Sequence, residues 1–442
     1  MELYSLLASR DGDACELGRG RPAAIRMKLL LVQNSLYYPA HGGGNKSNRL
    51  LLEALSKRGH LCRVVTRVSE TLDSERLRLF LADLESRSVS IDSSASVHRV
   101  REHLVDQMDE FNPDWTLLST DDPLQIFLSA ALDHGATGIV YLARTTLALP
   151  FGPDTALPSE QRTENLRRVA GIVAVSNYVK EYIERWGKMP AVALPISLHG
   201  DGPFPNLGRF GEGFVTMVNP CAIKGISIFL ELARLLPRAP FAAVPMWGTN
   251  EDDLQALEDL PNVTLLPPVD DINKVLAKTR VLLAPSLCHD AKPRIVFEAM
   301  SRGVPVIASD TGGVPEAMLG MDYVLPVRPI TSYQARLDSQ MVPKAHIPEQ
   351  DVKPWRQALE RLLTDRAHYE QLSRAGHEAA NEYARNLTIE PFENWLEQLA
   401  AARPPESGEP ANRAGTRDPL HGLSPEKRAL LLMRLRNQRR GE

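Results

Sequence analysis

Short apolar runs recur along the chain, and each is followed by a segment whose apolar residues return every three or four positions. The first run is Lys28–Gln33, and a helical pattern over 47–59 follows it after a glycine-rich loop. The next run is Leu61–Val68. A short, continuous apolar run is typical of a strand buried on both faces. The order strand, loop, helix, strand therefore predicts a parallel βαβ unit.

The same alternation continues in two series. In the first we expect further strands at Trp115–Ser119, Gly138–Leu142 and Gly171–Val175, with helices such as Leu124–His134 and Asn177–Trp186. In the second we expect strands at Phe214–Val218, Phe241–Pro245, Val263–Leu266, Val281–Ala284, Val304–Ala308 and Tyr323–Leu325. Its helices are expected at Ile226–Leu236, Asp271–Thr279, Arg294–Arg302 and, with breaks, over 355–401. The pattern predicts two doubly wound α/β domains, which place ligands at the carboxyl ends of the strands.

Glycine- and proline-rich stretches set the expected domain boundaries. We expect a weakly ordered extension over 1–26, a Rossmann-like domain over 27–200, a linker over 201–213 and a second Rossmann-like domain over 214–385. A helix over 386–402 is expected to return to the first domain, followed by a flexible linker over 403–423 and a basic amphipathic tail helix over 424–442.

Composition narrows the class of protein. The 442 residues are 43% hydrophobic and 24% charged, with a formal net charge of −4, which is ordinary for a globular protein and does not favour nucleic acid as a partner. The four cysteines are far apart and form no CxxC pair, so neither a zinc site nor a disulfide framework is indicated. No apolar run approaches the roughly 20 residues that span a bilayer, and no signal-peptide pattern is present, so we expect a cytoplasmic protein.

Two acidic residues follow the expected strand Val281–Ala284. Asp290 lies in the loop after it, and Glu298 lies near the start of the next helix. Both carboxylates are expected to face the cleft between the domains, where one can accept hydrogen bonds from sugar hydroxyls and the other from a ribose diol. The first N–H groups of that helix lack intrahelical partners, so they suit a diphosphate.

Loops after three other strands carry further candidates. Lys224 precedes the helix that follows Phe214–Val218, and Gly42-Gly43-Gly44 follows the first strand. A Gly312-Gly313 turn and Glu316 follow Val304–Ala308. Glycine permits a close approach of the backbone to a ligand, whereas the spacing of these glycines does not match a P-loop.

Together these segments resemble the retaining glycosyltransferases of family 4, which have the GT-B fold. The resemblance covers about residues 27–401, and its strongest part is 263–316, where Asp290 and Glu298 have the eight-residue spacing of the family's paired glutamates. It implies two facing Rossmann-like domains with an interdomain cleft, an acceptor domain over 27–200 and a nucleotide-sugar domain over 214–385. It also implies a nucleoside diphosphate sugar as donor and no further cofactor. It also implies that Asp290 contacts the sugar, Glu298 the ribose and Lys224 the diphosphate.

The chain departs from the family at several positions. Asp290 is shorter than the usual glutamate, Lys292-Pro293 replaces an aromatic-glycine pair, and Asn219 stands where an arginine is usual. We expect Arg294 to supply the missing cation, because arginine pairs well with phosphate. We expect no metal, since Asp121-Asp122 is only an adjacent pair and does not have the Asp-x-Asp spacing of a metal motif.

The expected site therefore has a catalytic set and a donor-binding set. The catalytic set is Asp290, Lys224, Arg294 and His41, and the donor-binding set is Gly43, Gly44, Asn219, Glu298, Gly312, Gly313 and Glu316. Arg144, after the strand Gly138–Leu142, is a further candidate for contacts at the reacting centre.

The tail 424–442 allows two interpretations. Its basic amphipathic pattern suits an anionic membrane surface, and it resembles a short segment before condensation domains of nonribosomal peptide synthetases. The second interpretation places the enzyme beside a biosynthetic assembly line, with a specialised metabolite as acceptor.

The leading hypothesis is retaining transfer of a sugar to a hydroxyl of a small-molecule or lipid-linked acceptor. The alternative is a catalytically weak GT-B protein that acts as a docking partner of a biosynthetic complex.

Overall fold

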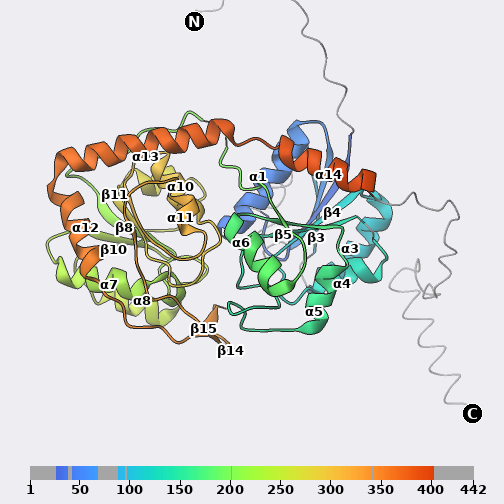
Figure 1. Cartoon of the computed structure of the whole chain (residues 1–442), viewed down its shortest axis with the longest axis horizontal. Helices are drawn as coiled ribbons and strands as arrows, with labels where there is room; N and C mark the ends of the chain where they lie inside the picture. The colour runs from blue at the N-terminus through green and yellow to red at the C-terminus, as the bar shows by residue number, and fades with distance from the viewer. Residues whose placement is uncertain are drawn as a thin grey trace, which may run out of the picture. The chain divides into compact units, whose positions relative to one another are not determined.

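The computed structural model describes residues 26–37, 42–67, 88–94, 97–136, 138–200, 202–340 and 342–402 (Figure 1). His41, the extension 1–25, the linker after 402 and the tail 424–442 lie outside the described residues, so the expectations for them stay predictions. No helix among the described residues has the length and apolarity needed to cross a membrane.

The first domain is built on a seven-stranded parallel sheet in the order β3-β2-β1-β4-β5-β6-β7. The strands are β1 Lys28–Val32, β2 Leu61–Arg67, β3 Val89–Ser94, β4 Trp115–Ser119, β5 Ile139–Ala143, β6 Gly171–Ala174 and β7 Val192–Ala193. The helices are α1 Gly43–Lys57, α3 Val97–Phe111, α4 Ile126–Asp133, α5 Glu160–Arg167 and α6 Asn177–Tyr182, which continues as a π-helical turn at Ile183–Gly187.

The second domain repeats the plan with a six-stranded parallel sheet in the order β10-β9-β8-β11-β12-β13. Its strands are β8 Phe214–Val218, β9 Phe241–Val244, β10 Val263–Leu265, β11 Thr279–Ala284, β12 Val306–Ser309 and β13 Val324–Leu325. Its helices are α7 Ile226–Leu235, α8 Glu251–Glu258, α9 Asn273–Leu276, α10 Arg294–Met300, α11 Val314–Ala317, α12 Lys353–Thr364 and α13 Arg366–Asn386. The predicted fold class, two doubly wound α/β domains, is confirmed.

Helices cover both faces of the second sheet (Figure 1). Val281 and Leu283 of β11 pack in one core cluster with α7 and α12, whereas Leu282 and Ala284 pack in another with α10 and α11. Successive side chains of a strand point to opposite faces, so a strand between two helix layers must be apolar at every position. This requirement explains the continuous apolar runs of the sequence.

Three features differ from the expected elements. The first helix begins at Gly43 rather than Ser47, with Gly42 at its N-cap position and a φ of 125°. Strand β3 falls in a region without a readable motif, because its sequence, VSIDSS, is mostly polar. A hairpin of β14 Tyr333–Leu337 and β15 Pro343–Ala345 follows β13 and was not expected.

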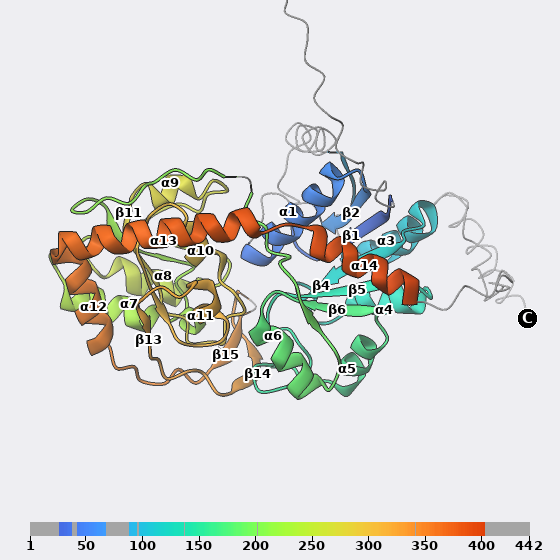
Figure 2. The same cartoon turned by 45° about the horizontal axis from the view of Figure 1, so that its top comes forward.

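The last helix, α14 Glu390–Ala402, follows α13 and reaches the first domain through its N-terminal half (Figure 2). Glu393 Oε1 accepts hydrogen bonds from Arg58 Nε at 2.7 Å and His60 Nε2 at 2.8 Å. The other ring nitrogen of His60, Nδ1, accepts a hydrogen bond from the Met27 N–H, so Nε2 is the nitrogen that donates to Glu393. Glu393 is buried, so it ties α14 to the end of α1 by charged hydrogen bonds away from solvent.

Replacing Glu393 with alanine is expected to lower the free energy of unfolding by about 2 kcal/mol, since the buried His60 ring loses its acceptor and the Arg58 guanidinium loses one of its two carboxylate partners. Urea unfolding followed by far-UV circular dichroism measures this change. Asn394→Ala, one residue further along α14 and exposed, is the control and is expected to unfold within about 0.5 kcal/mol of the wild type. Equal midpoints for both variants would contradict this role of Glu393.

Candidate active site

Lys224 and Asp290 meet at the carboxyl end of the second sheet. Lys224 ends the short 3-10 turn Ala222–Lys224 after β8, and Asp290 lies between the neighbouring strand β11 and α10. Lys224 Nζ is 2.5 Å from Asp290 Oδ2, and Ser286 Oγ donates to the same oxygen at 2.9 Å. Burial lowers the pKa of Lys224, but the Asp290 carboxylate outweighs it, so the pKa is raised and the ammonium stays charged.

A second ion pair, between Arg294 and Glu298, lies in α10, the helix that follows the Asp290 loop. Arg294 is the first residue of α10, and its Nη2 is 3.2 Å from Glu298 Oε1, in the i,i+4 arrangement. Both side chains are buried, and Lys46 Nζ of α1 approaches the same Glu298 oxygen at 4.0 Å. Arg294 Nη1 also donates to Ser47 Oγ at 3.0 Å and to the Leu198 carbonyl at 2.6 Å. Glu298 is therefore held between a cation of each domain.

The carboxyl ends of the two sheets face each other through such contacts. Ser47, which bonds Arg294, belongs to the helix after β1. Thr146 follows β5, and its Oγ donates to the His289 carbonyl at 3.4 Å. Doubly wound domains bind ligands at this edge of the sheet, so the loops after β1, β5, β8 and β11 meet where a shared ligand belongs.

The start of α1 lies against two arginines. A Cβ atom on Gly43 would lie 3.2 Å from Arg294 Cδ, and one on Gly44 would lie 3.7 Å from Arg144 Cδ. Arg144 bonds only neutral acceptors among the described residues, namely Asn48 Oδ1, Ser197 Oγ and the Ile196 carbonyl. Burial lowers the pKa of Arg144, and the nearby Arg294 lowers it further. Two mutually repelling guanidinium groups beside a helix start favour an anion there.

Gly312 and Gly313 pack against the loop that carries Asp290. Gly312 has a φ of 62°, and a Cβ on it would lie 2.5 Å from the Asp290 carbonyl oxygen. A Cβ on Gly313 would lie 1.8 Å from the Ala291 carbonyl oxygen, and the Gly313 N–H donates to the Asp290 carbonyl at 2.6 Å. These glycines position Asp290 by close backbone packing, and their expected contact with the donor stays a prediction.

Glu316 and Asn219 have structural partners in the described residues. The Glu316 carboxylate accepts the N–H groups of Asn177 at 3.1 Å and Tyr178 at 2.8 Å, so it caps α6 of the first domain. Asn219 has a φ of 59°, and its Oδ1 accepts the Gly248 N–H at 2.9 Å. Asn219 thus shapes the loop after β9 and, being neutral, does not supply the expected cation. For both residues a donor contact stays a prediction.

The pair His289–Asp154 joins the two domains next to Asp290, and sequence reasoning did not find it. His289 Nδ1 is 2.7 Å from Asp154 Oδ1, and Tyr178 Oη donates to the other Asp154 oxygen at 3.4 Å. Asp154 is buried, although it lies 135 residues from His289 in the sequence. In the sequence, only the position of His289 next to Asp290 pointed to this pair, and that position does not identify Asp154 as the partner.

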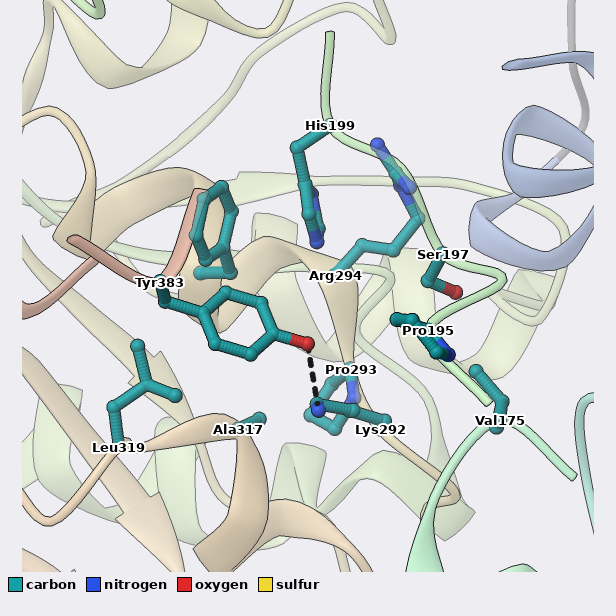
Figure 3. Close-up of a pocket in the computed structure, with 11 residues that line it drawn as sticks. Val175, Pro195, Ser197, His199, Lys292, Pro293, Arg294, Ala317, Leu319 and Tyr383 are labelled. Carbon is teal, nitrogen blue, oxygen red and sulfur yellow. Dashed lines mark hydrogen bonds between the residues drawn. The ribbon is translucent and has the colours of Figure 1, made fainter. Parts of the chain in front are cut away.

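A cavity of about 20 Å³ lies beside Arg294, where the segment 195–199 after β7 passes α10 (Figure 3). Lys292 points into this region, and its Nζ donates to Tyr383 Oη at 3.1 Å. The His199 ring stacks on Phe297 with centroids 3.8 Å apart. Such a cavity has room for about one water molecule.

Asp121, at the carboxyl end of β4, is expected to make stability depend on pH. Burial raises the pKa of Asp121 to about 6, against hydrogen bonds from Ser119 Oγ and the Asn34 N–H, both at 2.8 Å. An unfolded aspartate has a pKa of about 3.9, so the native state is favoured below pH 4 and loses this advantage as pH rises through 6. Because the side chain is partly exposed, we expect a loss on the order of 2 kcal/mol.

Urea unfolding at pH 4 and pH 7 measures this effect, with Asp121→Asn as the reference. The wild type is expected to lose about 2 kcal/mol more than this variant over the same range. Parallel pH curves for the two proteins would show that Asp121 ionises in the folded state as it does in the unfolded state.

A family model described as "Glycosyl transferases group 1" matches residues 212–365. Among curated proteins, the chain is similar to an exopolysaccharide phosphotransferase of Streptomyces coelicolor, with 25% identity over 262 residues. This match covers 56% of the chain and 26% of that protein, so the chain matches only about a quarter of its relative's length.

Solved structures show a similar fold along most of the chain. A TarM variant of S. aureus in complex with fondaparinux, α-GlcNAc-glycerol and UDP has a TM-score of 0.62 at 11% identity, covering 84% of this chain and 100% of that one. Anabaena HepE in complex with UDP and glucose has a TM-score of 0.58 at 15% identity, covering 86% and 100%. A glycosyltransferase of Rickettsia africae has a TM-score of 0.59 at 13% identity, with the same coverage.

Proposed function

We propose that this chain, a GT-B glycosyltransferase with a group 1 domain over residues 212–365, transfers a hexose from a UDP-sugar to an acceptor hydroxyl with retention of configuration. One observation carries the proposal. Each acid of the eight-spaced pair is bonded to its own cation, Lys224 to Asp290 and Arg294 to Glu298, where the loops of the two domains meet. Carboxylates accept hydrogen bonds from hydroxyls and cations bind phosphates, so this set of side chains suits a ligand that has both groups.

The nucleotide is proposed from chemistry and from likeness. Lys224, Arg294 and Arg144 form a cationic edge that suits a diphosphate, and the start of α1 adds unpaired N–H groups. TarM and HepE have this fold and were solved with UDP, which makes UDP the first nucleotide to test.

In the proposed reaction, the bond between the anomeric carbon and the phosphate oxygen breaks, and negative charge develops on the departing UDP. Lys224 stabilises this charge as a preorganised cation, with Arg294 and the α1 N–H groups as further donors. The acceptor oxygen bonds the anomeric carbon from the same face, and its proton passes to the departing phosphate oxygen. Every bond and charge is thereby balanced without a metal, and metal independence stays a prediction.

The hydrogen bonds of Asp290 support a role in holding the sugar rather than in attacking its anomeric carbon. Lys224 Nζ and Ser286 Oγ both bond Oδ2, and no described residue bonds Oδ1. An oxygen in this position can accept a hydrogen bond from a sugar hydroxyl, while the ion pair with Lys224 reduces the nucleophilicity of the carboxylate. The acceptor is proposed to be a small molecule or a lipid-linked sugar, and a specialised metabolite is the first class to test.

The test uses the purified full chain with a panel of UDP-hexoses and hydroxyl acceptors in the presence of EDTA. We expect release of UDP, an unchanged rate with and without EDTA, and a first-formed α-glycoside from a UDP-α-hexose by proton NMR. A β-glycoside would contradict retention. If no UDP-sugar reacts and UDP does not raise the melting temperature, the donor assignment is wrong, because a ligand of the native state must stabilise it.

A further inference from the structure

The hairpin β14–β15 approaches the loop that carries Asp290. Within the hairpin, Tyr333 pairs with Ala345. Just before it, the Ile330 N–H donates to the Leu287 carbonyl at 2.9 Å, three residues from Asp290. Tyr333 packs against the core cluster that contains Leu287 and Cys288. The hairpin is thus fixed to the Asp290 loop by backbone and by side chain.

The hydroxyl of Tyr333 is buried and has no hydrogen-bond partner among the described residues. A buried hydroxyl without a partner costs about 1–3 kcal/mol, and a ligand that supplied the partner would remove this cost. Burial raises the pKa of the Tyr333 phenol, and Cys288, Asp154, Asp290 and Tyr178 add to the shift. The phenol therefore stays neutral, and it can both donate and accept a hydrogen bond.

The polar groups around this phenol are already paired. Asp154 bonds His289 through one oxygen and Tyr178 through the other. Asp290 bonds Lys224 and Ser286 through Oδ2. The Tyr333 hydroxyl and Asp290 Oδ1 are different, because no described residue forms a hydrogen bond with either of them. Both atoms belong to the second domain.

We propose that Tyr333 is a specificity-determining residue that hydrogen-bonds a hydroxyl of the donor hexose beside Asp290. The proposal rests on the function proposed above and adds a contact that the Asp290–Glu298 pattern does not include. The donor is favoured over the acceptor because Tyr333 is attached to the Asp290 loop. It keeps its place relative to Asp290 even when the two domains move, as domains joined by a linker generally do.

Tyr333→Phe tests the proposal, because it removes one oxygen and keeps the ring. We expect a melting temperature equal to or above that of the wild type, an unchanged Kd for UDP, and kcat/KM for the UDP-hexose lowered about tenfold. The UDP-deoxyhexose that lacks the contacted hydroxyl is expected to be about tenfold poorer for the wild type but no poorer than the parent sugar for Tyr333→Phe. Tyr323→Phe is the matched control with unchanged kinetics, because Tyr323 lies just before β13 and its hydroxyl bonds His368 of α13 at 2.8 Å.

An unchanged kcat/KM in Tyr333→Phe would overturn the proposal, and so would a fall in melting temperature with kinetics intact, which indicates a structural role. These outcomes are separable from a failure of the proposed function. In that case the wild type itself transfers no hexose from any UDP-sugar, and both proposals are wrong.

Discussion

Lys224→Met is expected to lower kcat/KM for the UDP-hexose by about 100- to 1000-fold. Removing one preorganised donor from a developing oxyanion has an effect of this size, and Lys224 is a charged donor at the carboxyl end of β8. We expect most of the loss in kcat, because the charge on UDP grows as the bond breaks. Steady-state kinetics measures both constants, and Lys353→Met, an exposed lysine at the start of α12, is the control.

The same substitution leaves the Asp290 carboxylate without its cation, so stability must be followed beside activity. The double variant Lys224→Met/Asp290→Asn removes both charges and is expected to regain stability without regaining activity. A Lys224→Met protein that is folded at the assay temperature and keeps more than about a tenth of the wild-type kcat/KM would contradict the role of Lys224.

Gly313→Ala is expected to lower the free energy of unfolding by about 3 kcal/mol or more. The φ of Gly313 is −91°, which alanine adopts freely, so backbone strain does not contribute. The whole effect arises from the added methyl, which would lie 1.8 Å from the Ala291 carbonyl oxygen. The backbone there must move, and overpacking of this kind is strongly destabilising.

Thermal and urea unfolding measure this loss, and Gly376→Ala is the matched control. Gly376 lies inside α13, where a Cβ atom would lie 3.7 Å from Met300, an ordinary contact. Alanine there is expected to stabilise the protein by about 0.5–1 kcal/mol through its helix propensity. Because the Gly313 N–H bonds the Asp290 carbonyl, Gly313→Ala is also expected to lower transfer activity at temperatures where it is folded. A stable and fully active Gly313→Ala protein would show that the Asp290 loop does not depend on this packing.

The cationic side chains at the carboxyl ends of the two sheets come from both domains. Asn219 directs its side chain to the Gly248 N–H, so the second domain lacks a cation there. The first domain contributes Arg144 and the start of α1 instead. The cationic edge is thus shared by the two domains.

The sequence by itself determined the two domains and most of their elements, because strands and helices are encoded by short periodic patterns. The apolar runs Trp115–Ser119 and Phe214–Val218 became β4 and β8 without change. Asp290 and Glu298 were also readable, since they lie only eight positions apart, in one loop and the helix that follows it. The sequence did not predict the polar strand β3 or the hairpin that carries Tyr333, because neither segment has a periodic pattern of apolar residues.

Only the tertiary structure decided which groups meet. Lys224 and Asp290 are 66 residues apart, His289 and Asp154 are 135 apart, and Glu316 and Tyr178 are 138 apart. Their contacts depend on strand order, on the packing of glycine turns and on how the two domains face each other. None of these is a local property of the chain, so the partners of each charged group, and hence its chemistry, follow from packing alone.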